Sequence, residues 1–187
     1  MNTNRKVLII GAGGIGSFLI PLLDRVGIYQ IDVADPDKVE QKNLSYQNFE
    51  FDDVGINKAE AMSLPYNVKP IPYPILTDKQ LKGYELVICC VDNLGLRKTL
   101  YQSNVKWLDL RAQGRNCALV SYKADPSMYD SLLAGDDTRT FSCQGDSWNG
   151  NVIGVHFMQV AIAGMGAQWI QRWFNNEEVP EFRMVNV

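Results

Sequence analysis

The chain has 187 residues, and 18 basic residues against 21 acidic residues give it a net charge of −3 at pH 7. This length is typical of one domain, and we expect residues 1–187 to form one. The mildly acidic balance lacks the basic footprint that a protein needs to follow a nucleic-acid backbone. Hydrophobic residues (46%) and charged residues (21%) are close to globular averages, which excludes a disordered or fibrous chain.

The chain contains four cysteines, Cys89, Cys90, Cys117 and Cys143. They form no C-x-x-C pair, and His156 is the only histidine, so a zinc site with four ligands is not expected. Unpaired thiols in an ordinary composition suit a reducing compartment, and we expect a cytoplasmic protein. The uncharged run over 7–23 resembles a signal peptide, but its four glycines favour a strand, a turn and a helix.

Hydrophobic periodicity predicts alternating strands and helices in the first part of the chain. A short apolar run over 6–10 indicates a buried strand, and a helix over 17–26 with a kink at Pro21 follows it. A second strand is expected over 29–34, and the polar stretch over 38–56 is expected to be irregular.

Asn57 has Glu60 three residues later, the spacing of a capping box, and is expected to begin a short helix that ends before Pro65. The later elements are expected to be an edge strand over 69–75, a strand over 84–91, a helix over 96–103, strands over 105–110 and 117–123, a loop over 124–151 and a helix over 152–174. The fold class is therefore α/β: a Rossmann-like, doubly wound, mostly parallel sheet with helices on both faces.

A glycine-rich turn joins the first strand to the first helix. Gly11, Gly13 and Gly16 form G-x-G-x-x-G, which lets the backbone approach phosphates at a helix N-terminus. Asp35 follows the last of these glycines by 19 residues and ends the second strand, where a carboxylate can accept hydrogen bonds from ribose hydroxyls. The motif predicts a nucleotide site but does not choose between a dinucleotide and ATP.

Further motifs follow in order along residues 5–100. They are D-P-D-K-V from Asp35, N-L-S-Y-Q from Asn43, D-V-G-I-N-K ending at Lys58, and V-D-N ending at Asn93. This series resembles the ThiF, MoeB and HesA family of adenylyltransferases, which are similar to ubiquitin-activating enzymes. The resemblance implies activation of the C-terminal carboxylate of a small ubiquitin-like or sulfur-carrier protein, with ATP and Mg²⁺ as cofactors.

The resemblance also implies roles for particular residues. Lys58 would contact the phosphates and take part in catalysis, and Asp92 would bind Mg²⁺ at the end of a strand. Arg97 is expected to support the turn after Asp92 or the sheet. The nucleotide-binding residues would be Gly11, Gly13, Gly14, Gly16, Asp35, Asp37, Asn43, Gln47, Lys58, Asp92 and Asn93.

The chain also departs from the family pattern. Tyr46 stands where these enzymes usually have an arginine, and a phenol cannot supply the charge of that arginine. Either Arg111 or Arg115 takes over that charge, or ATP turnover is weaker. The paired C-x-x-C motifs of the zinc-bearing members are absent.

Cys143 lies in the polar loop before the last helix, where some ThiF-type enzymes carry a cysteine that links covalently to the activated carrier. It is either a nucleophile or an ordinary loop thiol. His156 is expected to be a core or interface histidine, and the apolar last helix with Gly164 and Gly166 suggests a homodimer. Two alternatives stay open, an NAD(P)-dependent Rossmann oxidoreductase and a non-catalytic ThiF-like nucleotide-binding scaffold.

Overall fold

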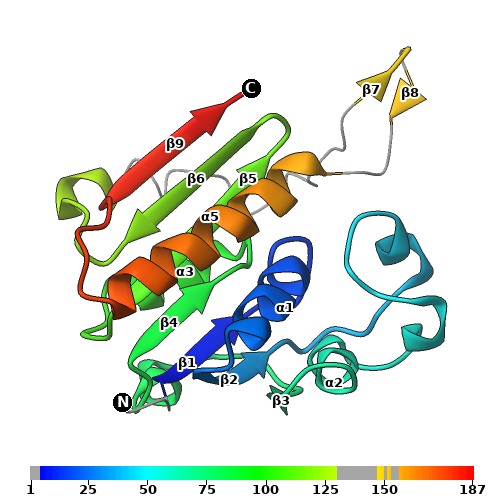
Figure 1. Cartoon of the computed structure of the whole chain (residues 1–187), viewed down its shortest axis with the longest axis horizontal. Helices are drawn as coiled ribbons and strands as arrows, with labels where there is room; N and C mark the ends of the chain where they lie inside the picture. Colours follow the sequence, from blue (N-terminus) through cyan, green and yellow to red (C-terminus); the bar gives the residue numbers. More distant parts are fainter. Residues whose placement is uncertain (1–4, 130–146, 150, 153–155) are drawn as a thin grey trace.

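The computed structural model describes residues 5–129, 147–149, 151–152 and 156–187. Its main sheet has seven strands in the order β3-β2-β1-β4-β5-β6-β9, and β1 to β5 run parallel (Figure 1). The strands of this sheet are β1 (Arg5–Ile10), β2 (Tyr29–Ala34), β3 (Val68–Ile71), β4 (Leu86–Cys89), β5 (Trp107–Gln113), β6 (Asn116–Ser121) and β9 (Phe182–Asn186). The helices are α1 (Gly16–Val26), α2 (Lys58–Ser63), α3 (Leu94–Tyr101) and α5 (Phe157–Phe174).

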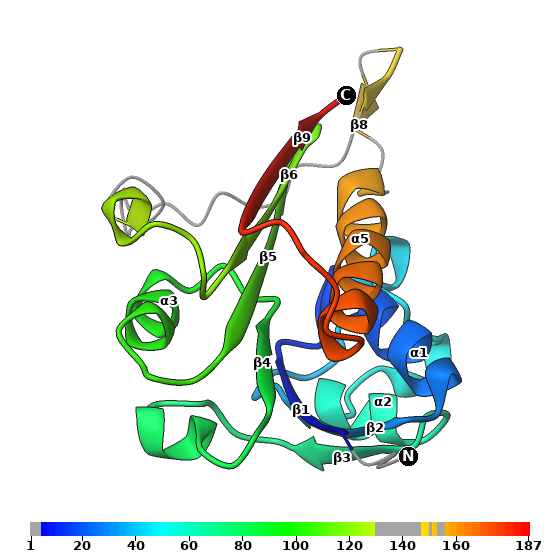
Figure 2. The same ribbon diagram turned by 60° about the vertical axis from the view of Figure 1, so that its left-hand side comes forward.

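The sheet has a hydrophobic core on each face. Along β1, Val7 and Ile9 belong to one core while Leu8 and Ile10 belong to the other. Figure 2 shows α1, α2 and α5 on one side of the sheet and α3 on the other. A strand that is covered on both faces must be apolar at successive positions, which explains the unbroken run in β1. The predicted α/β class and the doubly wound, mostly parallel sheet are confirmed.

The first helix shows how the local sequence sets the ends of an element. The helix α1 ends at Gly27, which adopts φ of 74° and donates its N–H to the carbonyl oxygen of Asp24. Only a residue without a Cβ takes this left-handed conformation at little cost. Pro21 lies inside α1, and the helix continues through it.

The segment between β2 and α2 is irregular, as expected, and contains two short 3-10 helices. They are η1 (Gln41–Ser45) and η2 (Phe51–Asp53). The segment is fixed to α1 because the hydroxyl of buried Ser17 accepts a hydrogen bond from the backbone N–H of Asn48 at 3.0 Å. Asn57 caps α2 as predicted, since its side-chain oxygen accepts the N–H groups of Ala59 and Glu60.

Several predicted boundaries were wrong. The edge strand β3 ends at Ile71 rather than at 75, and α3 begins at Leu94 because Asn93 caps it. Two short strands, β7 (Ser147–Trp148) and β8 (Asn151–Val152), pair where a loop was expected. Because residue 152 lies in β8, the last helix begins at Phe157 and not at 152. The strand β9 was not predicted, and it pairs antiparallel with β6 as the final strand of the sheet.

A buried ionic network joins α3 to the sheet. The carboxylate of Asp109 in β5 is fully buried and accepts hydrogen bonds from Arg97 at 3.3 Å, Tyr101 at 2.7 Å and Arg111 at 2.8 Å. Such a carboxylate needs these donors, because an unpaired charge in the core would be strongly destabilising. Arg97 therefore supports the sheet, one of the two roles expected for it.

None of the described helices combines the length and the hydropathy needed to cross a lipid bilayer.

The two glycines of α5, Gly164 and Gly166, give a matched test of how this helix packs against the sheet. A Cβ at Gly166 would lie 2.5 Å from Cδ1 of buried Leu110, whereas a Cβ at Gly164 would meet nothing within 4 Å. We expect Gly166→Ala to lower the free energy of unfolding by about 1–3 kcal/mol through overpacking. Gly164→Ala should raise it by about 0.5–1 kcal/mol, because alanine favours the helix. Denaturant unfolding measures both, and equal effects would contradict the packing described.

Candidate functional site

The candidate site lies where the strand order reverses. From β1 the chain builds the sheet outward through β2 and β3, and it then returns to the other side of β1 with β4 (Figure 1). Ile10 pairs with Ala34 of β2 and with Cys89 of β4, so the three strands end at the same level. Loops that leave parallel strands at such a point form the usual ligand crevice of open α/β sheets.

The glycine turn after β1 is held by close backbone contacts. Gly11 has φ of +96°, and a Cβ there would lie 2.5 Å from Cγ1 of Val91, just after β4. A Cβ at Gly16 would overlap the carbonyl oxygen of Gly11. A Cβ at Gly13 would lie no closer than 3.7 Å to its nearest neighbour, the Nε2 of Gln47. The geometry of the turn therefore requires glycine at positions 11 and 16. At position 13 there is room for a Cβ.

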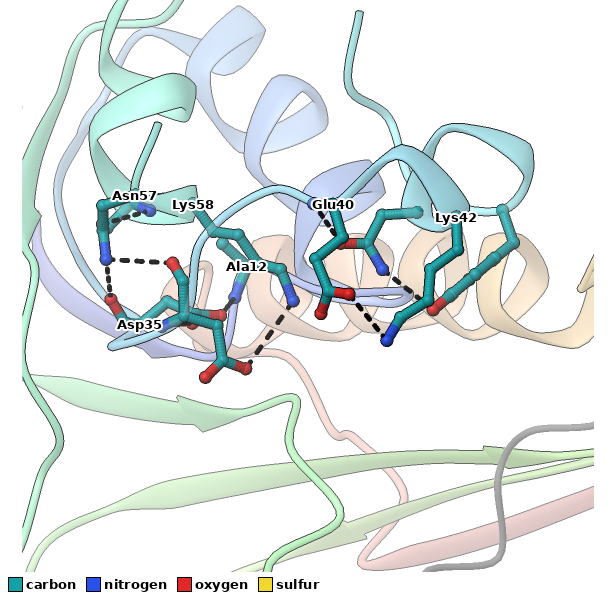
Figure 3. Close-up of polar contacts among 10 residues, drawn as sticks. Ala12, Asp35, Glu40, Lys42, Asn57 and Lys58 are labelled. Atoms are coloured by element: carbon teal, nitrogen blue, oxygen red, sulfur yellow. Dashed lines mark hydrogen bonds and ion pairs between the residues drawn. The ribbon is translucent and has the colours of Figure 1, made fainter. Parts of the chain in front are cut away.

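Asp35 ties this turn to the loop after β2. Its carboxylate is only 5% exposed and accepts the backbone N–H of Ala12 at 2.7 Å and that of Asp37 at 2.9 Å (Figure 3). Burial raises the pKa of Asp35, while these two N–H donors and the Lys58 ammonium oppose that rise. A carboxylate has about four acceptor positions, so Asp35 keeps capacity for a ligand hydroxyl.

The start of α2 brings a cation to the same place. The Asn57 amide donates to the carbonyl oxygens of Asp35 at 2.8 Å and Asp37 at 3.0 Å, which joins the α2 cap to the loop. The Lys58 side chain is 10% exposed, and its ammonium lies 3.7 Å from the exposed carboxylate of Asp37 (Figure 3). The structure thus brings together Asp35, Asp37 and Lys58, three of the residues expected to bind the nucleotide.

The 3-10 helix η1 and the two residues after it contain the N-L-S-Y-Q motif. Buried Asn43 accepts the N–H of Glu40 at 2.9 Å and donates to the hydroxyl of Tyr46 at 3.0 Å, so both ends of its amide hold the loop. The Tyr46 ring stacks on His156 with centroids 4.8 Å apart. This contact joins η1 to the residue before α5, and His156 is therefore outside the apolar helix in which it was expected.

Asp92 and Asn93 follow β4 at the same edge of the sheet. Asp92 is exposed, and Asn93 accepts the N–H of Leu96 at 2.8 Å as the cap of α3. The described residues contain no group of three acidic, histidine or cysteine side chains that could hold a metal ion by themselves. A Mg²⁺ ion at Asp92 would need ligand phosphates to complete its coordination, which is how proteins commonly bind this ion.

Arg111 and Cys143 were also expected to contribute to the site. Arg111 lies within β5 and donates to Asp109 and to the Tyr101 hydroxyl, so its guanidinium belongs to the buried network rather than to a loop after the strand. Cys143 lies outside the described residues. No sequence motif pointed to Gln159 of α5, whose side chain occupies the space where a Cβ of Gly14 would lie.

The comparison with protein families decides among the interpretations of this site. A model of the ThiF family matches residues 3–186. The chain belongs to the ThiF family. This match accounts for the motifs that follow the glycine turn along the chain. An NAD(P)-dependent oxidoreductase would explain the glycine turn and Asp35 but not those later motifs.

Three curated proteins to which this ThiF-family chain is similar are longer than it is. The adenylyltransferase and sulfurtransferase UBA4 of Saccharomyces cerevisiae is 33% identical over an alignment of 101 residues, and the match covers 48% of this chain and 23% of that protein. The ATP-dependent ubiquitin transferase-like protein Cap2 of Enterobacter hormaechei is 31% identical over 52% of this chain and 18% of its own. The ubiquitin-like modifier-activating enzyme 5 of Drosophila persimilis is 30% identical over 75% of this chain and 41% of its own.

Solved structures show the same fold. E. coli MccB with ATP superposes with a TM-score of 0.71 at 17% identity, covering 99% of this chain and 64% of MccB. MccB with succinimide gives a TM-score of 0.71 at 19% identity, covering all of this chain and 62% of MccB.

The described cysteines of this ThiF-family chain are poor nucleophiles. Cys89, Cys90 and Cys117 are buried and unpaired by disulfides. Burial raises the pKa of the Cys89 thiol to about 12 and that of Cys90 well above its ordinary value. Thiolate chemistry at neutral pH is therefore suppressed at both positions, where the thiols pack as small buried hydrophobic groups.

This burial predicts the pattern of thiol labelling. Brief treatment of the native protein with iodoacetamide at pH 7.5 should leave Cys89, Cys90 and Cys117 unmodified, and any label should be found on Cys143 by peptide mass spectrometry. Unfolding in guanidinium should make all four cysteines react. Rapid native labelling of Cys89 or Cys90 would contradict the burial described.

The glycine turn gives a second test. We expect Gly16→Ala to lower the free energy of unfolding by roughly 2 kcal/mol, because its Cβ would overlap a backbone oxygen that cannot move without opening the turn. Gly13→Ala should keep the stability of the wild type, since its nearest neighbour is at ordinary contact distance. Chemical unfolding of both variants distinguishes them, and a destabilised Gly13→Ala would show that the turn is tighter than described.

Proposed function

We propose that this ThiF-family chain is an ATP-dependent adenylyltransferase that activates the C-terminal carboxylate of a small ubiquitin-like or sulfur-carrier protein as an acyl-adenylate. The observation that carries the proposal is the Asp35 carboxylate, which joins the glycine turn to the loop that presents Lys58. This arrangement offers a ribose acceptor, a backbone cradle and a cation within one crevice. Its parts fit ATP in particular, because Lys58 suits a ligand with several phosphates.

The proposed reaction is a displacement at the α-phosphorus of ATP. An oxygen of the carrier carboxylate forms a bond to that phosphorus, the bond to the bridging oxygen breaks, and pyrophosphate leaves. Such chemistry depends on positioning and on cancelling negative charge more than on covalent help from the protein. The Lys58 ammonium is largely desolvated, which strengthens its attraction for phosphate oxygens compared with an exposed lysine.

Each remaining residue has a place in this proposal. Asp35 would hold the ribose, and the backbone of the turn from Gly11 to Gly16 would lie along the phosphates. Asp92 would bind Mg²⁺ together with phosphate oxygens, and the ion would neutralise charge that develops on the pyrophosphate. The proposal also includes Asp37, Asn43, Gln47 and Asn93 as residues of the nucleotide site, with Asn43 and Asn93 acting through the loops that they hold in place.

The relatives support the proposal by what their names say. UBA4 is named an adenylyltransferase and sulfurtransferase, Cap2 is named an ATP-dependent ubiquitin transferase-like protein, and MccB has been solved with ATP. The chain spans less than half the length of these curated relatives, so the activity is proposed for this chain on the strength of its own site.

A non-catalytic scaffold is the second candidate, and Tyr46 favours it. The phenol of Tyr46 accepts a hydrogen bond from Asn43 and stacks on His156, so it contributes packing where related enzymes have a cation. A scaffold of this kind would bind ATP and release it unchanged.

The adenylyltransferase proposal has three further parts. They are Cys143 as the thiol that receives the carrier, a homodimer and a cytoplasmic location. Size measurement by light scattering tests the dimer.

An exchange assay separates the candidates. Wild-type protein should exchange labelled pyrophosphate into ATP when a small carrier protein ending in Gly-Gly is present. Lys58→Ala should lower that exchange by about 10²- to 10³-fold, the effect of removing one group that stabilises a charged transition state. Lys82→Ala changes an exposed lysine paired with Asp78, far from the site in sequence, and should leave the rate unchanged.

The control outcomes decide between the two candidates. ATP binding without exchange for any carrier tested would favour the scaffold. Exchange that survives in Lys58→Ala would show that the buried ammonium does not act on the phosphates.

A further inference from the structure

The ammonium of Lys58 has an incomplete set of partners in the ligand-free site. The Lys58 side chain is 10% exposed, and its Nζ lies 3.7 Å from Oδ2 of Asp37 (Figure 3). This distance is too long for a hydrogen bond, so the two groups form an ion pair without one. Among the described residues the ammonium makes no hydrogen bond, and its three N–H donors remain available to a ligand.

Asp37 is held in place by its main chain and not by its carboxylate. Its N–H donates to Asp35 at 2.9 Å. Its carbonyl oxygen accepts the backbone N–H of Lys58 at 2.8 Å and the side-chain amide of Asn57 at 3.0 Å. The side chain is 71% exposed, and its carboxylate accepts no hydrogen bond from a described residue. The carboxylate can therefore turn away from Lys58 into solvent while the backbone of the site stays in place.

The charge of Lys58 acts on three carboxylates. Burial raises the pKa of Asp35, two backbone N–H donors and then Lys58 lower it, and the nearby charge of Asp37 raises it. The pKa of Glu40 is lowered, chiefly by Lys42 at 2.8 Å and to a smaller extent by Lys58. Phosphates that enter this site are attracted by one ammonium and repelled by these carboxylates. Asp35 is fixed by N–H donors and Glu40 has its own cation, so Asp37 is the carboxylate that can withdraw.

We propose that Asp37 is a displaceable counter-ion of Lys58, which pairs with the ammonium in the empty site and gives way to the phosphates of ATP. In the empty site the carboxylate keeps a largely buried ammonium from lacking an opposite charge. A triphosphate displaces it, because several charges at hydrogen-bond distance attract the ammonium more strongly than one carboxylate at 3.7 Å. The carboxylate returns to Lys58 when pyrophosphate leaves. The inference rests on the proposed ATP site and deepens it, because it gives Asp37 a role in binding and release.

Titration calorimetry with ATP, pyrophosphate and adenosine in the presence of EDTA tests the proposal. Asp37→Asn keeps the size of the side chain and the main-chain contacts, and it removes the charge. We expect the Kd for ATP and for pyrophosphate to fall about three- to tenfold, because the phosphates no longer compete with a carboxylate. Adenosine has no phosphate and should bind to the variant as it does to the wild type.

Asp78→Asn is the matched control for this measurement. Asp78 is also exposed, lies 3.8 Å from the ammonium of Lys82, and is not one of the residues of the proposed site. Its substitution changes the net charge of the protein by the same amount as Asp37→Asn. All three ligands should bind to Asp78→Asn with the affinity of the wild type.

A second background shows whether Asp37 acts through the lysine. In Lys58→Met the apolar stem of the side chain is largely kept and the ammonium is absent. Adding Asp37→Asn to this variant should improve the affinity for ATP less than twofold, since no cation remains for which carboxylate and phosphates compete. Equal gains in both backgrounds would show that Asp37 only repels phosphates, and the proposal would fail.

The remaining outcomes separate this inference from the ATP site. Unchanged or weaker ATP binding by Asp37→Asn would overturn the inference and leave the site intact. A loss of affinity that appears only when Mg²⁺ is added would make Asp37 a metal ligand, which also contradicts the proposed role. A wild-type protein without affinity for ATP would overturn both the site and the inference.

Stability gives a readout that excludes a merely structural role. Because its carboxylate has no hydrogen bond to a described residue, Asp37→Asn should unfold at the same denaturant concentration as the wild type while binding ATP more tightly. A clearly lower unfolding concentration would show that the carboxylate supports the loop instead, contrary to the proposal.

Discussion

The site depends on a single buried carboxylate. Asp35 accepts one N–H from the glycine turn and another from the loop after β2, and Asn57 binds the main chain of that same loop. Without these contacts the turn, the loop and the start of α2 would have separate positions at the end of the sheet. Burial disfavours the ionised form of Asp35, whereas both N–H donors and Lys58 favour it. The carboxylate thus holds the glycine turn and the loop after β2 together in the absence of a ligand.

The strand order explains why such a carboxylate can act there. Because β1, β2 and β4 end level, the first residues after each strand meet at one edge of the sheet. The turn passes so close to the segment after β4 that Gly11 has no room for a side chain beside Val91. The glycine motif therefore serves two purposes. Gly11 and Gly16 allow the backbone to fold back on itself, and Gly13 and Gly14 leave two openings that side-chain amides approach.

Local sequence was sufficient for most of the fold, because burial on both faces of a parallel sheet leaves a plain signature of apolar runs. The strands β1 and β2, the Gly27 end of α1 and the Asn57 cap of α2 all followed from short-range rules. The strand β9 was missed because its exposed outer edge carries no such run. Gln159 was missed for another reason. It contacts Gly14, which lies more than 140 residues away in the sequence, and the local sequence around neither residue predicts that contact.

Tyr46 is another residue whose contacts the local sequence did not predict. Its sequence position suggested a deficit of charge in the phosphate site, and the structure shows that its ring joins η1 to His156 at the start of the α5 segment. Gln47 follows Tyr46 directly and Gln159 lies three positions after His156, and their side chains are the ones nearest to Gly13 and Gly14. The stack therefore joins the two segments whose glutamines lie against the glycine turn. What replaces the missing arginine is thus a packing contact that fixes the turn's neighbours, and not a charge.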